Sequence, residues 1–198
     1  MPDTSTLSPD IYIRGDDGTL HQTDGTTDAT VKGWLGGVVY ANTAASAAHT
    51  STTTEAILDT SYTIPANTLV AGSVIKVRYQ GIATASTNTD TLTVKLYIGG
   101  TSGTALLTGT ATDTAANNIF TGEATIVVRT AGTSGTFVAV GSHADVPAAS
   151  GTASPVYEIT ASTAINTETT QVLGVGADWS TTDVNNSCRL DIFVVEIY

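Results

Sequence analysis

Apolar and polar residues alternate along much of the chain, most clearly within residues 62–79, which read YTIPANTLVAGSVIKVRY. There Lys76 and Arg78 separate an isoleucine, a valine and a tyrosine, which is the period of a β-strand with one buried face. Proline, asparagine and glycine precede this run and supply turn residues. The segment therefore predicts a short strand, a turn and a longer strand.

From about residue 55 onward, similar runs recur at regular spacing. They predict strands at residues 55–64, 73–85, 91–99, 104–112, 119–131, 136–144, 154–164, 170–180 and 187–198. Clusters of glycine, asparagine, aspartate, serine and proline separate the runs, and no intervening segment has the length and pattern of a crossover helix. The prediction is an all-β protein built as an antiparallel β-sandwich or barrel.

Residues 1–54 differ from the rest, because short apolar runs are surrounded by polar tracts. Such a region cannot build a core of its own, so we predict an extended N-terminal arm at residues 1–54 and a β-sandwich at residues 55–198. Four large apolar residues of the arm are the expected anchors to the body or to a partner: Ile11, Tyr12, Trp34 and Tyr40.

The last predicted strand is apolar on both faces over residues 191–198. A strand of this kind is buried on both sides. Two interpretations stay open: Phe193 and Val195 contribute to a subunit interface, or the strand is central and covered by the arm. The single cysteine, Cys188, lies in an alternating pattern with Leu190 and is expected to be a small core residue.

Composition narrows the choice of partners. Threonine makes up about a fifth of the chain, and its β-branched side chain suits a pleated strand surface. The chain has 18 acidic and 7 basic residues and a net charge of −11. A negative surface repels phosphate backbones and anionic lipids, so neither nucleic acid nor membrane is an expected partner. Residues 1–20 lack the apolar segment of a signal peptide, so synthesis in the cytoplasm is expected.

No motif predicts a catalytic, cofactor-binding or metal-binding residue. The aspartates of the arm do not follow the spacing of a calcium-binding loop: Asp16, Asp17, Asp24 and Asp28. The histidines are isolated in the sequence and are expected to be solvated: His21, His49 and His143. Trp179, Tyr97 and Tyr157 leave the stacking of a sugar ring open, although aromatic residues on sandwich strands are more often core.

Several runs together resemble a family. Residues 62–69 (YTIPANTL), 71–78 (AGSVIKVR), 91–100 (TLTVKLYIGG) and 122–129 (GEATIVVR) follow a pattern common in structural proteins of tailed bacteriophages. The likeness extends over about residues 60–198. It implies a jelly-roll module of the virion, usually trimeric, that serves as a capsid decoration (cement) protein or as part of a head or tail fibre. The family has no catalytic residues to carry over.

These observations lead to one functional hypothesis and one alternative. The first is a non-enzymatic virion protein on the outer surface of the capsid, which binds the major capsid protein as a homotrimer and uses residues 1–54 for attachment. An arm with sparse apolar anchors can follow a large surface, and three copies multiply weak contacts. The alternative is a head-fibre or tail-fibre module that recognises a glycan of the host surface.

Overall fold

A computed structural model of the 198-residue chain describes residues 10–13, 20–23, 28–30, 37–85, 87, 89–109, 112–113, 117–146 and 156–198. The chain divides into two compact units, one of residues 1–37 with Tyr198 and one of Val38–Ile197, which we call the body. The first unit contains three short strands in one antiparallel sheet: β1 (Asp10–Ile13), β2 (Leu20–Thr23) and β3 (Asp28–Thr30).

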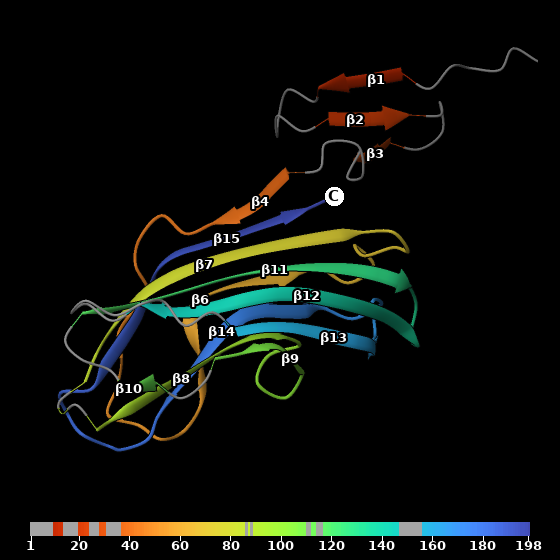
Figure 1. Ribbon diagram of the computed structural model, residues 1–198. Coiled ribbons are helices and arrows are strands. Elements are labelled where there is room, and N and C mark those ends of the chain that lie inside the picture. The colour runs from red at the N-terminus through yellow and green to blue at the C-terminus, as the bar shows by residue number, and fades with distance from the viewer. Residues whose placement is uncertain are drawn as a thin grey trace, which may run out of the picture. The chain divides into compact units, whose positions relative to one another are not determined.

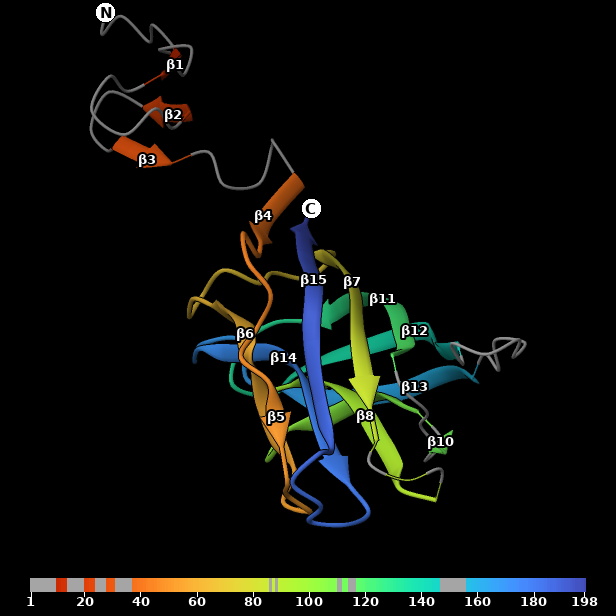
Figure 2. The ribbon, with the colours of Figure 1, turned by 90° about the vertical axis from the view of Figure 1, so that its left-hand side faces the viewer.

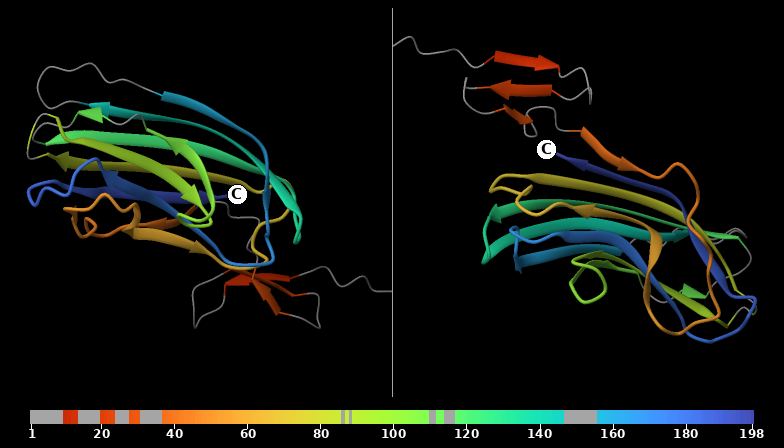
Figure 3. Two further views of the ribbon diagram at one scale, coloured as in Figure 1. Left: turned by 90° about the horizontal axis from the view of Figure 1, so that it is seen from below. Right: turned by 180° about the vertical axis from the view of Figure 1, so that it is seen from behind.

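Two antiparallel sheets form the body and pack face to face (Figures 1 and 3). The larger sheet has the order β13 (Val156–Ile165), β12 (Gly135–Val146), β11 (Asn118–Thr130), β7 (Val74–Thr84), β15 (Ser187–Ile197) and β4 (Gly37–Ala41), and β5 (His49–Thr50) also pairs with β15. The smaller sheet has the order β10 (Thr112–Asp113), β8 (Thr91–Ile98), β14 (Gln171–Trp179) and β6 (Ala56–Ile64), and β9 (Thr104–Thr108) pairs with β8. The predicted antiparallel β-sandwich is thus confirmed.

The order of the strands is that of a jelly roll. In one sheet β4, β15, β7 and β11 lie side by side, and in the other β6, β14, β8 and β9. The first and last of these strands along the chain are therefore neighbours, and the chain passes repeatedly from one sheet to the other, as in the double-sheet jelly roll. Strands β12 and β13 extend the larger sheet beyond β11 (Figure 1).

Between the sheets lies one hydrophobic core, to which nearly every long strand contributes alternate residues. Strand β7 illustrates this alternation: Ile75, Val77 and Tyr79 are buried. Lys76 and Arg78 between them are exposed, as the sequence predicts. Aromatic side chains fill the centre, and the largest of them are fully buried: Trp179, Tyr79, Phe120, Phe137 and Phe193. Burial of this apolar surface, at about 25 cal/mol per Å², is the main force that holds the two sheets together.

A β-bulge in β15 changes which of its residues face the core. The pairing of β15 with β7 shifts between Leu190 and Ile192. Before the shift Cys188 and Leu190 point inward, whereas after it Phe193 and Val195 are inward and Ile192 is 37% exposed. A bulge places one additional residue in a strand, so the alternation restarts on the other face. Cys188 is a buried core residue, as predicted.

Two polar side chains continue the hydrogen bonding of β15 between β4 and β5. The backbone N–H of Asn42 donates to the carbonyl of Phe193 at 3.1 Å, and its Oδ1 accepts from the N–H of Phe193 at 2.7 Å. The N–H of Ser46 donates to the carbonyl of Leu190 at 2.8 Å, and its Oγ accepts from the N–H of Leu190 at 2.9 Å. Together with β4 and β5, they satisfy the second edge of β15.

The domain boundary in the structure therefore differs from the one expected at residues 54/55. The body begins at Val38, because residues 38–54 supply strands and hydrogen bonds that β15 needs on its outer edge. The structure shows that the last strand is central, because the chain that precedes residue 55 pairs with its outer edge. That chain does not cover the outward face of the strand, where Ile192 is 37% exposed, so the expected cover is absent there.

Two truncations test this boundary. Removal of residues 1–36 leaves β4 whole, and we expect cooperative unfolding with a Tm close to that of the full chain. Removal of residues 1–54 strips β15 of at least four hydrogen bonds, each contributing about 1 kcal/mol, so the Tm should fall by roughly 10 °C or more. Calorimetry of both proteins checks this. Equal Tm values for the two truncations would show that residues 37–54 do not support the body.

Candidate functional site

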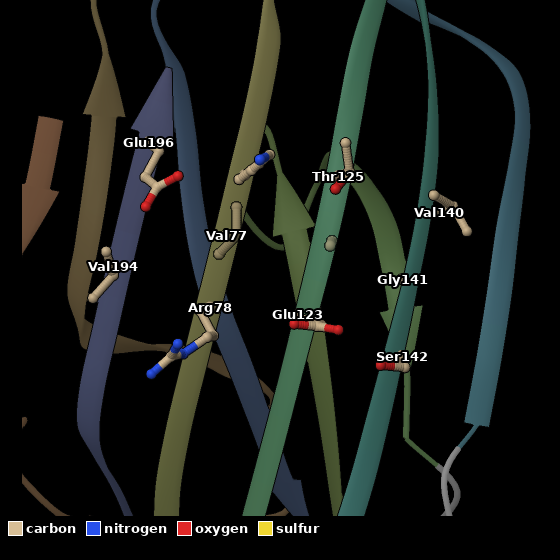
Figure 4. Close-up of a pocket in the computed structure, with 11 residues that line it drawn as sticks. Val77, Arg78, Glu123, Thr125, Val140, Gly141, Ser142, Val194 and Glu196 are labelled. Atoms are coloured by element: carbon tan, nitrogen blue, oxygen red, sulfur yellow. The ribbon is translucent and has the colours of Figure 1, made fainter. Parts of the chain in front are cut away.

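The outward face of the larger sheet carries the best candidate for a functional site. Two rows of side chains cross β15, β7, β11 and β12 there, in direct register. One row is Val194, Arg78, Glu123 and Ser142, and the next is Glu196, Lys76, Thr125 and Val140. We call these eight residues the outer-sheet surface. They line a shallow depression of about 450 Å³, shown in Figure 4.

Apolar and charged groups are interleaved on this surface. Val140 is 53% exposed, and Ile192, in the neighbouring row, is 37% exposed. Such residues are ordinary when scattered singly, but here they flank charged side chains on adjacent strands. The combination of exposed aliphatic and charged groups on a rigid sheet is suited to a protein–protein contact.

The charges of the outer-sheet surface balance one another. Lys76 lies opposite Glu196 across the β7–β15 pair, and Arg78 lies opposite Glu123 across the β7–β11 pair. In Figure 4 the Arg78 side chain extends toward β15 and away from Glu123. No hydrogen bond or ion pair joins the side chain of Arg78 or of Glu123 to another described residue. Both charges are exposed and available to a partner.

Three of the predicted partner-binding residues lie together in the body. Phe193 and Val195 are fully buried, so they are core residues and not a contact surface. Tyr40 packs against the core, with its ring centroid 5.9 Å from that of Phe193 and 5.7 Å from that of Tyr62. The bulge explains the difference, because it turns the opposite residues of β15, Val194 and Glu196, outward.

The other predicted anchors belong to the N-terminal unit. The backbones of Ile11 and Tyr12 lie in β1 and pair with β2, and their side chains are outside the described residues. Trp34 also lies outside the described residues. Their expected contact with a partner stays a prediction.

A polar network lies on the outward face of the smaller sheet. Lys95 Nζ forms an ion pair with Glu55 Oε2 at 3.0 Å, and the Tyr97 hydroxyl donates to Glu55 Oε1 at 2.9 Å. The hydrogen bond to Glu55 raises the pKa of Lys95, and burial raises the pKa of Tyr97. These bonds connect β8 to Glu55, which precedes β6, so the network stabilises the fold.

Next to this network, Asp178 and His49 have unsatisfied atoms. Asp178 Oδ1 and His49 Nε2 are buried without a hydrogen-bond partner among the described residues. Burial raises the pKa of Asp178 and lowers the pKa of His49, because it disfavours the charged form of each group. Within the described parts of the chain, no group of three or more His, Cys, Asp or Glu residues could hold a metal ion.

The prediction that the histidines are solvated is wrong for His143. This side chain is 2% exposed, and its Nδ1 lies 2.8 Å from the Tyr79 hydroxyl while its Nε2 lies 3.3 Å from Asp145 Oδ1. The Asp145 carboxylate can only accept, so Nε2 donates to it, and in the neutral ring Nδ1 then accepts from the Tyr79 hydroxyl. Glycine makes the space, since a Cβ at Gly122 would lie 2.3 Å from the Tyr79 hydroxyl oxygen. Glycine opposite an aromatic residue on a neighbouring strand is a sequence feature that could have indicated this packing.

Three further side chains are less accessible than a binding or reactive role requires. Trp179 is 1% exposed and points into the core, so it cannot stack on a sugar ring. Tyr97 is also buried and bonded to Glu55. Burial raises the pKa of Cys188 to about 12, which leaves its thiol protonated and unreactive at neutral pH.

No protein-family model matches the chain. No curated protein matches it either. Among the residues that the structure describes, there is no helix with the length and hydropathy to cross a bilayer.

The pKa shift of Asp178 predicts how stability depends on pH. Its pKa is higher in the folded chain than in the unfolded chain, so the folded state binds the proton more tightly and stability falls as pH rises through the folded pKa. Asp178→Asn removes the charge and should raise the free energy of unfolding at pH 7, an advantage that disappears near pH 3. Urea denaturation at both pH values checks this, with the exposed Glu168→Gln as control. A gain of equal size at both pH values would contradict this account.

Proposed function

We propose that this chain is a non-enzymatic structural protein of a tailed-phage virion, which decorates and stabilises the capsid by binding the major capsid protein as a homotrimer. The observation that carries the proposal is the outer-sheet surface, a broad contact face on a rigid jelly roll. The resemblance of residues 60–198 to phage structural proteins supplies the virion context.

The energetics of the body suit this role. A decoration protein adds rigidity to a shell, so its own fold must be stiff and its contacts must lie outside its core. The polar networks of Glu55 and of His143 are hydrogen-bonded within the body, and they tie strands together. The exposed charged and aliphatic groups of the larger sheet are therefore the groups of the body best placed to contact another protein.

The N-terminal unit is the proposed attachment element. It is compact by itself and contains a small antiparallel sheet, so it can bind a surface without unfolding the body. Residues 1–37 hold 6 acidic and 2 basic residues, which favours a basic patch on the capsid. In a trimer three such units act together, and avidity can raise the affinity by about 10² or more over a single contact.

Binding to capsids tests the proposal. The full chain, added to capsids that lack it, should co-sediment with them and give additional density on their outer surface by electron cryo-microscopy. The protein without residues 1–36 keeps its body, yet its affinity should fall by at least about tenfold, because the attachment unit is missing. Glu168→Gln, a change on an exposed turn of the body, serves as the control with full binding.

Two results would contradict the proposal. Failure of the full chain to bind capsids is one. The other is specific binding to a host glycan on an array together with density on a head or tail fibre, which would support the receptor-binding alternative. Undiminished capsid binding without residues 1–36 would show that the body, and not the N-terminal unit, makes the attachment.

A further inference from the structure

The outer-sheet surface is neutral on a strongly acidic chain. Its two basic and two acidic residues cancel, so the remaining 5 basic and 16 acidic residues carry the whole net charge of −11. Two copies of this chain repel each other on average, and the repulsion is smallest where charges of both signs alternate. A partner of opposite charge would be drawn to the rest of the molecule. The surface therefore fits a second copy of the same chain.

The two halves of the surface are complementary in charge. The β15–β7 half holds Lys76, Arg78 and Glu196 and has a net charge of +1, whereas the β11–β12 half holds Glu123 and has a net charge of −1. Each half also contributes one valine, Val194 or Val140. When the first half of one copy meets the second half of another, opposite charges face each other and the valines share the contact.

We propose that the outer-sheet surface is the interface between copies of this chain, with Arg78 of one copy paired with Glu123 of the next. This inference rests on the proposed function, which requires a homotrimer, and identifies the surface that makes it. Half-to-half contact is compatible with closed symmetry, because the halves differ and each copy can offer one half to each neighbour. In the isolated chain neither Arg78 nor Glu123 is engaged with another described residue, so both are free to pair in this way.

The contact that this surface offers to each neighbour is small. Strands lie about 4.8 Å apart and outward residues about 6.8 Å apart along each strand, so four strands over four rows, the two rows of the surface and one on either side, span roughly 500 Å², of which roughly 250 Å² faces each neighbour. The additional rows hold Ile192 and Val127, which extend the apolar part of the contact. Strands β4 and β13 widen the whole face to roughly 800 Å², or about 400 Å² for each neighbour, which is about half of what one partner contributes to a standard interface, so we expect association that depends on concentration.

Charge reversal tests the pairing. Sedimentation equilibrium of the full chain over a range of concentrations should show association of the wild type. Arg78→Glu and Glu123→Arg should each weaken that association by at least about tenfold, because each change places like charges opposite each other. The double variant R78E/E123R restores opposite charges at every contact of the ring and should recover association.

The control is Glu168→Arg, which makes the same charge change on an exposed turn outside the surface and should leave association unchanged. Circular dichroism verifies that each variant is folded, which is expected because both substituted residues are exposed. A monomeric wild type, or single variants that associate like the wild type, would overturn the inference, as would failure of the double variant to recover association. Capsid binding by single variants that associate like the wild type would overturn this inference while the proposed function stands. Association of a wild-type chain that does not bind capsids would contradict the proposed function and leave this inference standing.

Discussion

The body depends on the pairing of β15 along both of its edges. A central strand cannot leave a row of N–H and C=O groups unbonded in the interior of a protein. Strand β7 satisfies one edge, whereas the other is shared among β4, Asn42, Ser46 and β5. Through Phe193 and Val195 the same strand also fills the centre of the core. Strand β15 thus joins the larger sheet, contributes to the core and holds the first strand of the body in place.

The outer-sheet surface follows from the same strand. Without the shift between Leu190 and Ile192, alternation from Cys188 would place Ile192 and Val194 inside and Phe193 outside. The additional residue reverses this, so the aromatic ring lies in the core, and a valine and a glutamate face outward beside Arg78 and Lys76. One additional residue in β15 therefore determines which side chains of this strand face outward and can contact a partner.

Much of the fold could be predicted from the sequence, because most strands alternate strictly. The expected strand at residues 73–85 corresponds to β7 (Val74–Thr84), and the outward placement of Lys76 and Arg78 followed from it. The bulge was hidden because residues 191–198 are apolar on both faces, so either phase satisfies the pattern. Strands β4 and β5 were missed because they are short and their partner lies some 150 residues later in the chain.

The candidate site was harder to predict than the fold. Glu123 and Val140 lie in strands that the sequence identified, but only the register of four strands brings them beside Arg78. His143 was expected in solvent, and its burial depends on Tyr79, which is 64 residues away, and on the space that Gly122 leaves. Alternation gives the face of a residue, whereas its neighbours across strands come from long-range pairing.

Because β4 and β15 are neighbours, the chain enters and leaves the body at the same end. The body begins at Val38 and ends at Ile197. These residues belong to β4 and β15, which lie side by side in Figure 2. The 11 residues of β15 separate this end of the body by roughly 35 Å from the loop of residues 180–186 at the other end. Val184 in that loop is 79% exposed. Cargo fused to Val38 or to Ile197 of the body alone would emerge from one end, and a peptide grafted into the loop would be displayed from the other.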